Sequence, residues 1–268
     1  MLELGFMQRA LVAVTVIAAV APLVGAFVVQ RRQSLIGDGM GHMAFAGVGL
    51  ALLTGVEPVL GALALTVVAA LALARMSGRQ GGDLPLALLF YGGIAAGFLL
   101  TARAGGGQTA VLGLLFGSPF NLSWRQVGVV VVLAGLVVLV VAAVYRQLVA
   151  MAFDEPSARV AGIPTSGLSL ALTVLVALVV VAGMSTVGLL LISALLVVPV
   201  AAAAQLAGSY RATLAIASAT GAVSALVGLS ASYYADLAPG AAVVVTAIGL
   251  YALAGLAAGV RGRLAVRP

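Results

Sequence analysis

Residues 30–47 read QRRQSLIGDGMGHMAFAG and lead into a long apolar stretch of the chain. They contain the only histidine, His42, four residues after Asp38. In a helix this spacing places both side chains on one face, about 6 Å apart along the axis. A carboxylate and an imidazole so placed can share one divalent cation. The alternative is that Asp38 caps a helix and His42 only forms a local hydrogen bond, and the pair alone leaves both interpretations open.

The composition around this stretch belongs to a membrane protein. Of 268 residues, 63% are hydrophobic and 7% are charged, whereas a soluble domain carries about 25% charged residues. The apolar runs approach 20 residues and lack strict alternation, which favours helices over a barrel. The absence of cysteine excludes disulfides and thiolate metal sites. We therefore predict an all-α polytopic membrane protein with one transmembrane domain over residues 1–268.

The apolar runs predict nine spans, at residues 10–29, 40–55, 58–76, 84–102, 127–144, 168–182, 187–205, 212–228 and 240–259. An eight-span arrangement, with one short helix failing to cross, stays open. Residues 108–117 are apolar but too short for a bilayer core of about 30 Å, so we expect a re-entrant or interfacial segment.

The arginines orient these spans. With nine spans and the N-terminus outside, three arginines lie outside, and the C-terminus is cytoplasmic. The cytoplasmic side then holds Arg31, Arg32, Arg75, Arg79, Arg146, Arg159, Arg211, Arg261, Arg263 and Arg267. This bias fits a multi-pass protein of the cell membrane. It also explains the formal charge of +6 without a nucleic-acid partner.

The longest polar connection contains MAFDEPSARVAGIP, residues 151–164. Asp154 and Glu155 precede Pro156, as at a helix N-terminus, and Gly162 ends the helix two turns later. We expect a short cytoplasmic helix, about 153–163, with apolar contacts at Phe153, Val160 and Ile163. Such a helix suits a soluble partner that pushes on the membrane domain, although capped helical turns also occur in many loops.

No energy source is visible in the chain. It has no G-x-x-x-x-G-K-[ST] motif, and without lysine a P-loop of that kind is impossible. The buried acidic and histidine residues of a proton or sodium relay are also missing. We therefore predict that the chain is no enzyme and that a separate subunit supplies the power for transport.

Four motifs resemble the permease subunits of ABC importers for zinc, manganese and iron(II), the ABC-3 family. They are QRALVAVTVIAAVAPLVGAFVVQRRQSLIGDGMGH, LLFGSPFNLSW, FDEPSARVAGIP and VGLLLISALLVVPVAAAAQLA, and they occur in the family's order over nearly the whole chain. After the aspartate the family usually reads SHA-x-L-PG, whereas this chain reads GHMAFAG.

The resemblance implies a type II importer architecture. Two permease copies would form a homodimer with two ATPase subunits and an extracytoplasmic metal-binding protein. Asp38 and His42 would face the path of the metal. The residues implied in ATPase coupling are Phe153, Asp154, Glu155, Ala158, Gly162 and Ile163. No permanently bound cofactor is expected, and the transported ion would be a divalent metal, with zinc ahead of manganese.

Three other functions stay open. A permease for a metal chelate, such as a siderophore or cobalamin, would have a wider path in which Asp38 and His42 are dispensable. A self-powered secondary carrier would transport without any ATPase and would show an internal repeat. In a non-transporting scaffold, neither Asp38 nor the cytoplasmic loop would matter.

Overall fold

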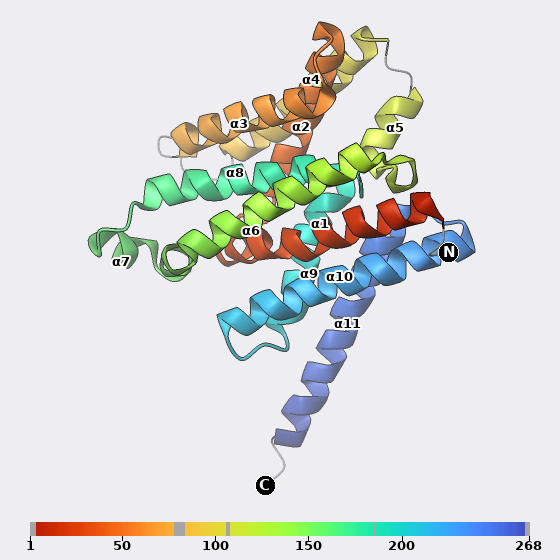
Figure 1. Ribbon diagram of the computed structural model, residues 1–268. Coiled ribbons are helices and arrows are strands. Elements are labelled where there is room, and N and C mark those ends of the chain that lie inside the picture. Colours follow the sequence, from red (N-terminus) through yellow and green to blue (C-terminus); the bar gives the residue numbers. More distant parts are fainter. Residues whose placement is uncertain (1–3, 78–83, 106–107, 185, 266–268) are drawn as a thin grey trace.

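The computed structural model describes residues 4–77, 84–105, 108–184 and 186–265, and throughout these ranges the regular structure is helical (Figure 1). The helices are α1 (Gly5–Gln30), α2 (Ile36–Thr54), α3 (Pro58–Ser77), α4 (Leu84–Arg103), α5 (Gln108–Phe116), the 3₁₀ turn η1 (Pro119–Asn121), α6 (Trp124–Phe153), α7 (Glu155–Val160), α8 (Thr165–Met184), α9 (Leu189–Ala204), α10 (Tyr210–Ala235) and α11 (Pro239–Ala265). The predicted all-α class is confirmed.

Eight helices in the described ranges are long and apolar enough to cross a membrane. Helix α9, the candidate for a ninth span, has only 16 residues, yet it also runs from one end of the bundle to the other. At its start, Leu191 lies beside Gly240, the second residue of α11. At its end, Ala204 shares a cavity with Gln30 and Tyr210, the last residue of α1 and the first of α10. The predicted eight to nine spans are therefore confirmed, with α9 as the short one.

The start of α1 and the end of α11 lie far apart (Figure 1). Near the N-terminus, Phe6 packs edge-on against Phe120 of η1, with ring centroids 5.8 Å apart. Toward the C-terminus, the Gln205 side-chain amide donates to the Tyr251 carbonyl at 3.4 Å, at the far end of α9. An odd number of crossings follows from this arrangement.

Helix α2 packs most extensively on α4, and the two helices run parallel. Gly39 of α2 faces Leu86 near the start of α4, and Gly49 faces Leu100 near its end. Small residues allow helix backbones to approach closely in lipid, where no hydrophobic force drives helices together. The glycines of the stretch 30–47 therefore decide how closely α2 fits against its neighbours.

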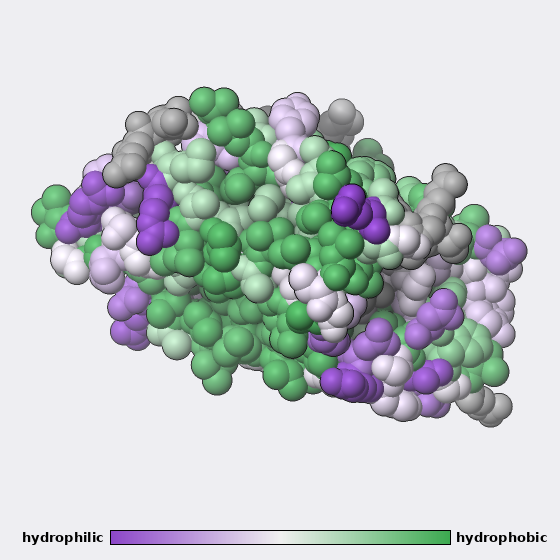
Figure 2. Space-filling model, turned by 90° about the horizontal axis from the view of Figure 1, so that it is seen from above, coloured by the Kyte–Doolittle hydropathy of each residue, from purple (hydrophilic) through white to green (hydrophobic). Residues whose placement is uncertain are grey.

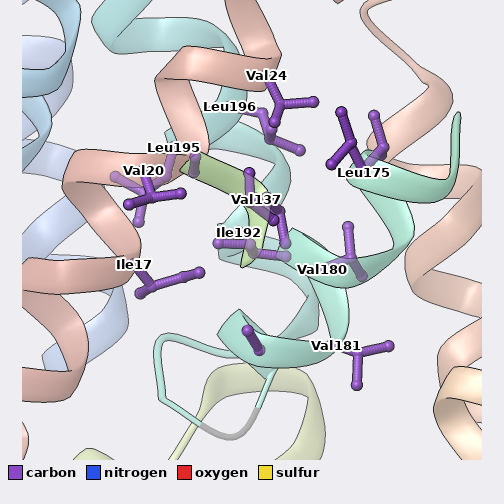
Figure 3. Packing of buried hydrophobic residues seen from close by; sticks show 14 of the residues in the cluster. Ile17, Val20, Val24, Val137, Leu175, Val180, Val181, Ile192, Leu195 and Leu196 are labelled. Carbon is purple, nitrogen blue, oxygen red and sulfur yellow. The ribbon is translucent and has the colours of Figure 1, made fainter. Parts of the chain in front are cut away.

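A continuous apolar core joins α1, α6, α8 and α9 (Figure 3). Ile17 of α1, Val180 of α8 and Ile192 of α9 are fully buried in it. On the outside, Figure 2 shows a broad apolar band, with most hydrophilic residues toward the two ends of the molecule. Such a surface fits a bilayer whose hydrocarbon core meets the middle of the helices.

Several helices extend beyond their predicted spans, among them α1, which begins at Gly5, α10, which ends at Ala235, and α6. Helix α6 continues nine residues beyond the predicted end of its span, to Phe153. Its extension stays in contact with the core, because Leu148 and Met151 are buried. Hydropathy falls after Val144, but the helix does not end there. The apolar segment predicted at 108–117 is the nine-residue helix α5, too short to cross.

Candidate functional site

Asp38 lies in the first turn of α2 but does not cap it. The cap position is Leu35, and no described side chain caps this helix end. A carboxylate in the first turn is favoured by the positive end of the helix dipole. The capping alternative for Asp38 is therefore wrong, and the predicted helical spacing of Asp38 and His42 is confirmed.

His42 lies one turn further along α2, about 6 Å along the axis from Asp38. Its side chain is buried, and its ring packs edge-on against Phe90 of α4 with centroids 4.6 Å apart. Its Nδ1 atom is buried without a hydrogen-bond partner among the described residues. Buried polar atoms nearly always have a hydrogen-bond partner. The Nδ1 atom is therefore a candidate to coordinate a passing metal ion.

Two neighbouring helices frame the carboxylate. Gly37 of α2 faces Ser193 and Leu196 of α9, and Gly39 faces α4. Since successive residues turn by about 100° around a helix, Asp38 lies between these two directions. Asp38 itself is half-buried. The Ser193 hydroxyl is also buried and, within the described ranges, unpaired.

Close helix packing fixes the position of His42. A Cβ atom added to Gly93 of α4 would lie 2.7 Å from the His42 carbonyl carbon. Glycine at position 93 thus brings Phe90 onto the imidazole ring. Sequence reasoning missed both α4 residues, because neither carries a metal-ligand signature.

The described residues offer only two strong metal donors at this point. No group of three or more His, Asp or Glu side chains gathers anywhere in the described ranges. A closed zinc site needs four ligands, and manganese usually has about six, mostly oxygen. The pair can therefore hold an ion only loosely, as suits a path through which ions pass.

The predicted cytoplasmic helix is present as α7, which covers six residues of the predicted range 153–163. The Asp154 carboxylate accepts a hydrogen bond from the Ser157 backbone N–H at 3.1 Å and another from the Ser157 hydroxyl. These bonds lower the pKa of Asp154, the hydroxyl contributing most. Gly162, with φ of +81°, follows the helix in the left-handed conformation that glycine tolerates best. The predicted acidic cap and glycine stop are confirmed.

The remaining coupling candidates lie within α7 or next to it. Within α7, Ala158 is buried, while Val160, for which an apolar contact was expected, is 90% exposed. Phe153 is the last residue of α6, and its ring packs edge-on against Tyr210 of α10, with centroids 5.5 Å apart. Ile163 packs against the apolar core. Helix α7 is therefore anchored from below and presents its outer face to solvent.

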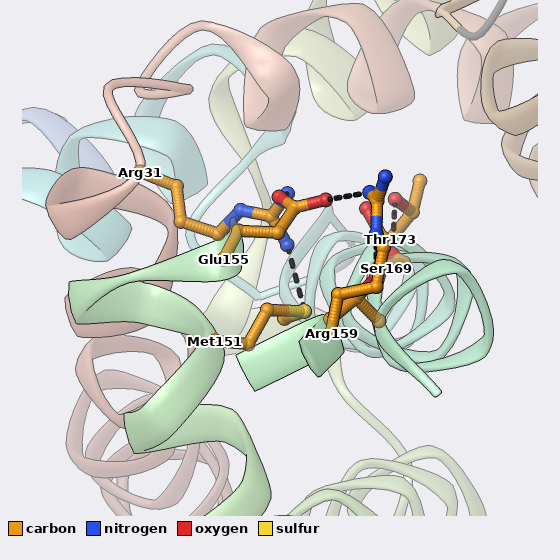
Figure 4. Close-up of polar contacts among 7 residues, drawn as sticks. Arg31, Met151, Glu155, Arg159, Ser169 and Thr173 are labelled. Carbon is orange, nitrogen blue, oxygen red and sulfur yellow. Dashed lines mark hydrogen bonds and ion pairs between the residues drawn. The ribbon is translucent and has the colours of Figure 1, made fainter. Parts of the chain in front are cut away.

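Glu155 connects α7 to the turn before α2 (Figure 4). Its Oε2 atom accepts from Nη2 of Arg31 at 2.8 Å, and its Oε1 atom accepts from Nη2 of Arg159 at 3.0 Å. A second Arg31 nitrogen lies 3.1 Å from the Met151 sulfur. No sequence pattern indicates the Arg31 contact, since its partner lies 124 positions away.

The chain matches known proteins over almost its full length. Residues 3–258 match the ABC 3 transport family. The manganese transport system membrane protein MntC of Listeria innocua is 31% identical over 266 residues, which cover 98% of this chain and 95% of that protein. The manganese import system permease protein ScaB of Streptococcus gordonii is 31% identical over 247 residues, 90% of this chain and 87% of that protein.

The fold also matches a solved structure. PsaBC from Streptococcus pneumoniae, solved in complex with Fab, has a chain that superposes with a TM-score of 0.87 and 28% sequence identity. The superposition covers 94% of this chain and 92% of that chain. The match over residues 3–258, together with these relatives, shows that the chain is a membrane-spanning member of the ABC 3 transport family.

Proposed function

We propose that this chain forms the membrane path of an ATP-driven importer for a divalent transition metal, with manganese first and zinc second. The observation that carries the proposal is the unpaired Nδ1 of His42, buried one turn from Asp38 inside a membrane helix. Ionisable groups at such depth are costly and usually mark a substrate or ion pathway.

The order of the two metals reverses that of the sequence analysis. The relatives MntC and ScaB are named for manganese. The chemistry also favours manganese, because one carboxylate and one imidazole leave room for water and carbonyl oxygens that complete a larger shell. Zinc prefers a closed set of four ligands, which these residues do not supply.

The partners proposed are a second permease copy, an ABC ATPase and an extracytoplasmic metal-binding protein. The exposed face of α7 is where the ATPase would press, with Phe153, Asp154, Glu155, Ala158, Gly162 and Ile163 holding that face. The α7 end would be cytoplasmic. Among the arginines whose burial the structure describes, the α7 end holds Arg31, Arg32, Arg75, Arg146, Arg159 and Arg211. The opposite end holds Arg9, Arg103 and Arg125, so the positive-inside rule favours a cytoplasmic location for the α7 end.

A metal chelate fits the site less well than a bare ion. Phe90 lies against the His42 ring, and Gly93 lies against its backbone, so α4 leaves no room for a bulky chelate on its own side of the imidazole. The chelate function predicts that Asp38 and His42 are dispensable, which separates the two proposals experimentally.

The test is ATP-dependent uptake of manganese and zinc by proteoliposomes containing the assembled complex. Asp38→Ala and His42→Ala are compared with Asp236→Asn, a conservative change of an acidic residue at the C-terminal cap of α10. We expect the two site variants to lower manganese uptake more than about tenfold while ATP hydrolysis persists. Normal uptake in both would reject the metal path and favour the chelate.

A further inference from the structure

A basic pocket opens at the α7 end of the molecule. Its volume is about 660 Å³, and it lies between the end of α1, the end of α3, α7 and the start of α8. The charged residues lining it are three arginines and one glutamate: Arg31, Arg75, Arg159 and Glu155. The proposed function uses the ion pair in this pocket but gives no role to the pocket itself.

The pocket carries an excess of positive charge. Glu155 is shared between Arg31 and Arg159, so one carboxylate meets two guanidinium groups. Arg75 adds a third, from the last turn of α3, and it is exposed. The four charged groups together leave a formal charge of +2, which attracts an anion with more than one charged oxygen.

Hydroxyl groups line the α8 side of the same pocket. Ser166, Ser169 and Thr173 recur at intervals of three and four residues, so they share one face of α8. The Thr173 hydroxyl already donates to the Ser169 carbonyl at 3.0 Å, as Figure 4 shows. The hydroxyls of Ser166 and Ser169 can donate to an oxyanion bound by the arginines.

An apolar stripe leads along α3 to this pocket. Leu60, Ala64, Val68 and Leu71 are exposed on one face of the helix, and Arg75 continues the same face. From Arg75 back to Ala64 this face spans about 16 Å along the helix axis. This is close to half of the bilayer core of about 30 Å, the depth of one lipid leaflet, whereas Leu60 lies one turn farther from the pocket. A ligand that fits both features has a phosphate head and a hydrocarbon tail.

We propose that the pocket binds the headgroup of an anionic phospholipid, with an acyl chain lying along the α3 stripe. Basic pockets between membrane helices are established binding sites for anionic headgroups. A free phosphate would fill the pocket but would leave the stripe unused. The inference depends on the membrane location of the chain and not on which metal it moves.

The test is lipid retention by the permease assembled with its ATPase. The complex is extracted from vesicles of equal phosphatidylglycerol and phosphatidylcholine, and retained lipids are counted by native mass spectrometry. We expect the wild type to retain phosphatidylglycerol preferentially, and Arg75→Gln to lower that preference about fivefold. Arg103→Gln is the matched control, because Arg103 ends α4 at the opposite end of the bundle. Arg159→Gln, which leaves the partly buried Arg31–Glu155 pair in place, should also lower the preference.

Four outcomes would overturn the proposal. The first is equal retention of both lipids by the wild-type complex. The second is an equal loss of preference in Arg75→Gln and Arg103→Gln. The third is displacement of phosphatidylglycerol by excess inorganic phosphate, which would identify a free-anion site. The fourth is a disulfide between two copies of the Val68→Cys variant, because the stripe would then lie where two permease copies meet. The chain has no other cysteine.

Discussion

Arg31 and Glu155 form an ion pair of 2.8 Å between the C-terminal cap of α1 and the first residue of α7. The Arg31 side chain is only 12% exposed, and α2 begins five residues after it. In the proposed transport cycle, a displacement of α7 would be passed through this pair to the turn that leads to Asp38. This contact links the proposed ATPase docking helix to the turn before the proposed metal site.

Breaking this pair should separate ATP hydrolysis from transport. We expect Glu155→Gln and Arg31→Gln each to lower metal uptake about tenfold while ATP hydrolysis by the complex remains, because α7 no longer holds the turn before α2. The measurement is the ratio of metal transported to ATP hydrolysed in proteoliposomes. Arg159→Gln is the control, since its side chain is 70% exposed and such pairs contribute little.

A charge swap distinguishes the effect of the ion pair from the separate effects of its two residues. In Arg31→Glu with Glu155→Arg, the transport ratio should recover in part, with a coupling free energy of about 1 kcal/mol between the positions. Strict additivity of the two single changes would contradict a direct role for the pair and leave each residue with a separate, local effect.

Sequence alone predicts most of the fold because the bilayer constrains helix length and composition so strongly. Apolar runs of about 20 residues identify the spans, and the D-E-P sequence identifies the start of α7. The end of α6 was not predictable from hydropathy, since its last nine residues are polar in part and only some of them are buried against protein. Their helical continuation depends on Leu148 and Met151, which contact the core from outside the predicted span.

The candidate site was predictable only in its local part. Asp38 and His42 lie four residues apart, so helical geometry alone brings them to one face. Phe90, Gly93 and Ser193 come from α4 and α9, and no spacing in the sequence relates them to His42. Their positions follow from the packing of α4 and α9 on α2, which cannot be predicted from residue spacing in a single sequence. The metal role of the pair stays a prediction.

Gly93 should control the position of His42. Gly93→Ala would place a Cβ 2.7 Å from the His42 carbonyl carbon, so α4 must move away from α2. We expect a loss of about 1–3 kcal/mol in stability, as for other overpacked sites, together with weaker metal uptake. Thermal unfolding of the purified permease and uptake assays measure both effects.

The neighbouring glycine provides the control for this change. An added Cβ at Gly92 meets no described atom within 4 Å. Gly92→Ala should therefore keep uptake at the wild-type level and keep or slightly raise stability, because alanine favours helix more than glycine does. Equal effects of the two substitutions would show that close α2–α4 packing does not position His42.

The start of α7 should loosen in acid. Hydrogen bonds from Ser157 lower the pKa of Asp154, so the folded state binds its proton less readily than the unfolded state. The resulting stabilisation is fully present above the ordinary pKa of 3.8 and is lost as the pH falls through the lower folded value. The protection of the Ser157 amide against hydrogen exchange, taken relative to the intrinsic rate at each pH, should fall below pH 3.8 in the wild type. Asp154→Asn keeps a capping side chain but should remove this pH dependence.

The contact between α1 and α10 should depend on Gly221. Pro22 has no N–H, so the Ala18 carbonyl four residues earlier lacks its helical partner, and a Cβ on Gly221 would lie 1.9 Å from that oxygen. We expect Gly221→Ala to lower the free energy of unfolding by about 1–3 kcal/mol or more, because the atom in the way is backbone. Gly128→Ala in α6, where the added Cβ meets no described atom within 4 Å, is the matched control and should not destabilise. If α10 approaches α1 because of the proline, Pro22→Ala should change the loss of unfolding free energy caused by Gly221→Ala in a double-mutant cycle. Identical losses in both backgrounds would mean that the approach does not depend on the proline.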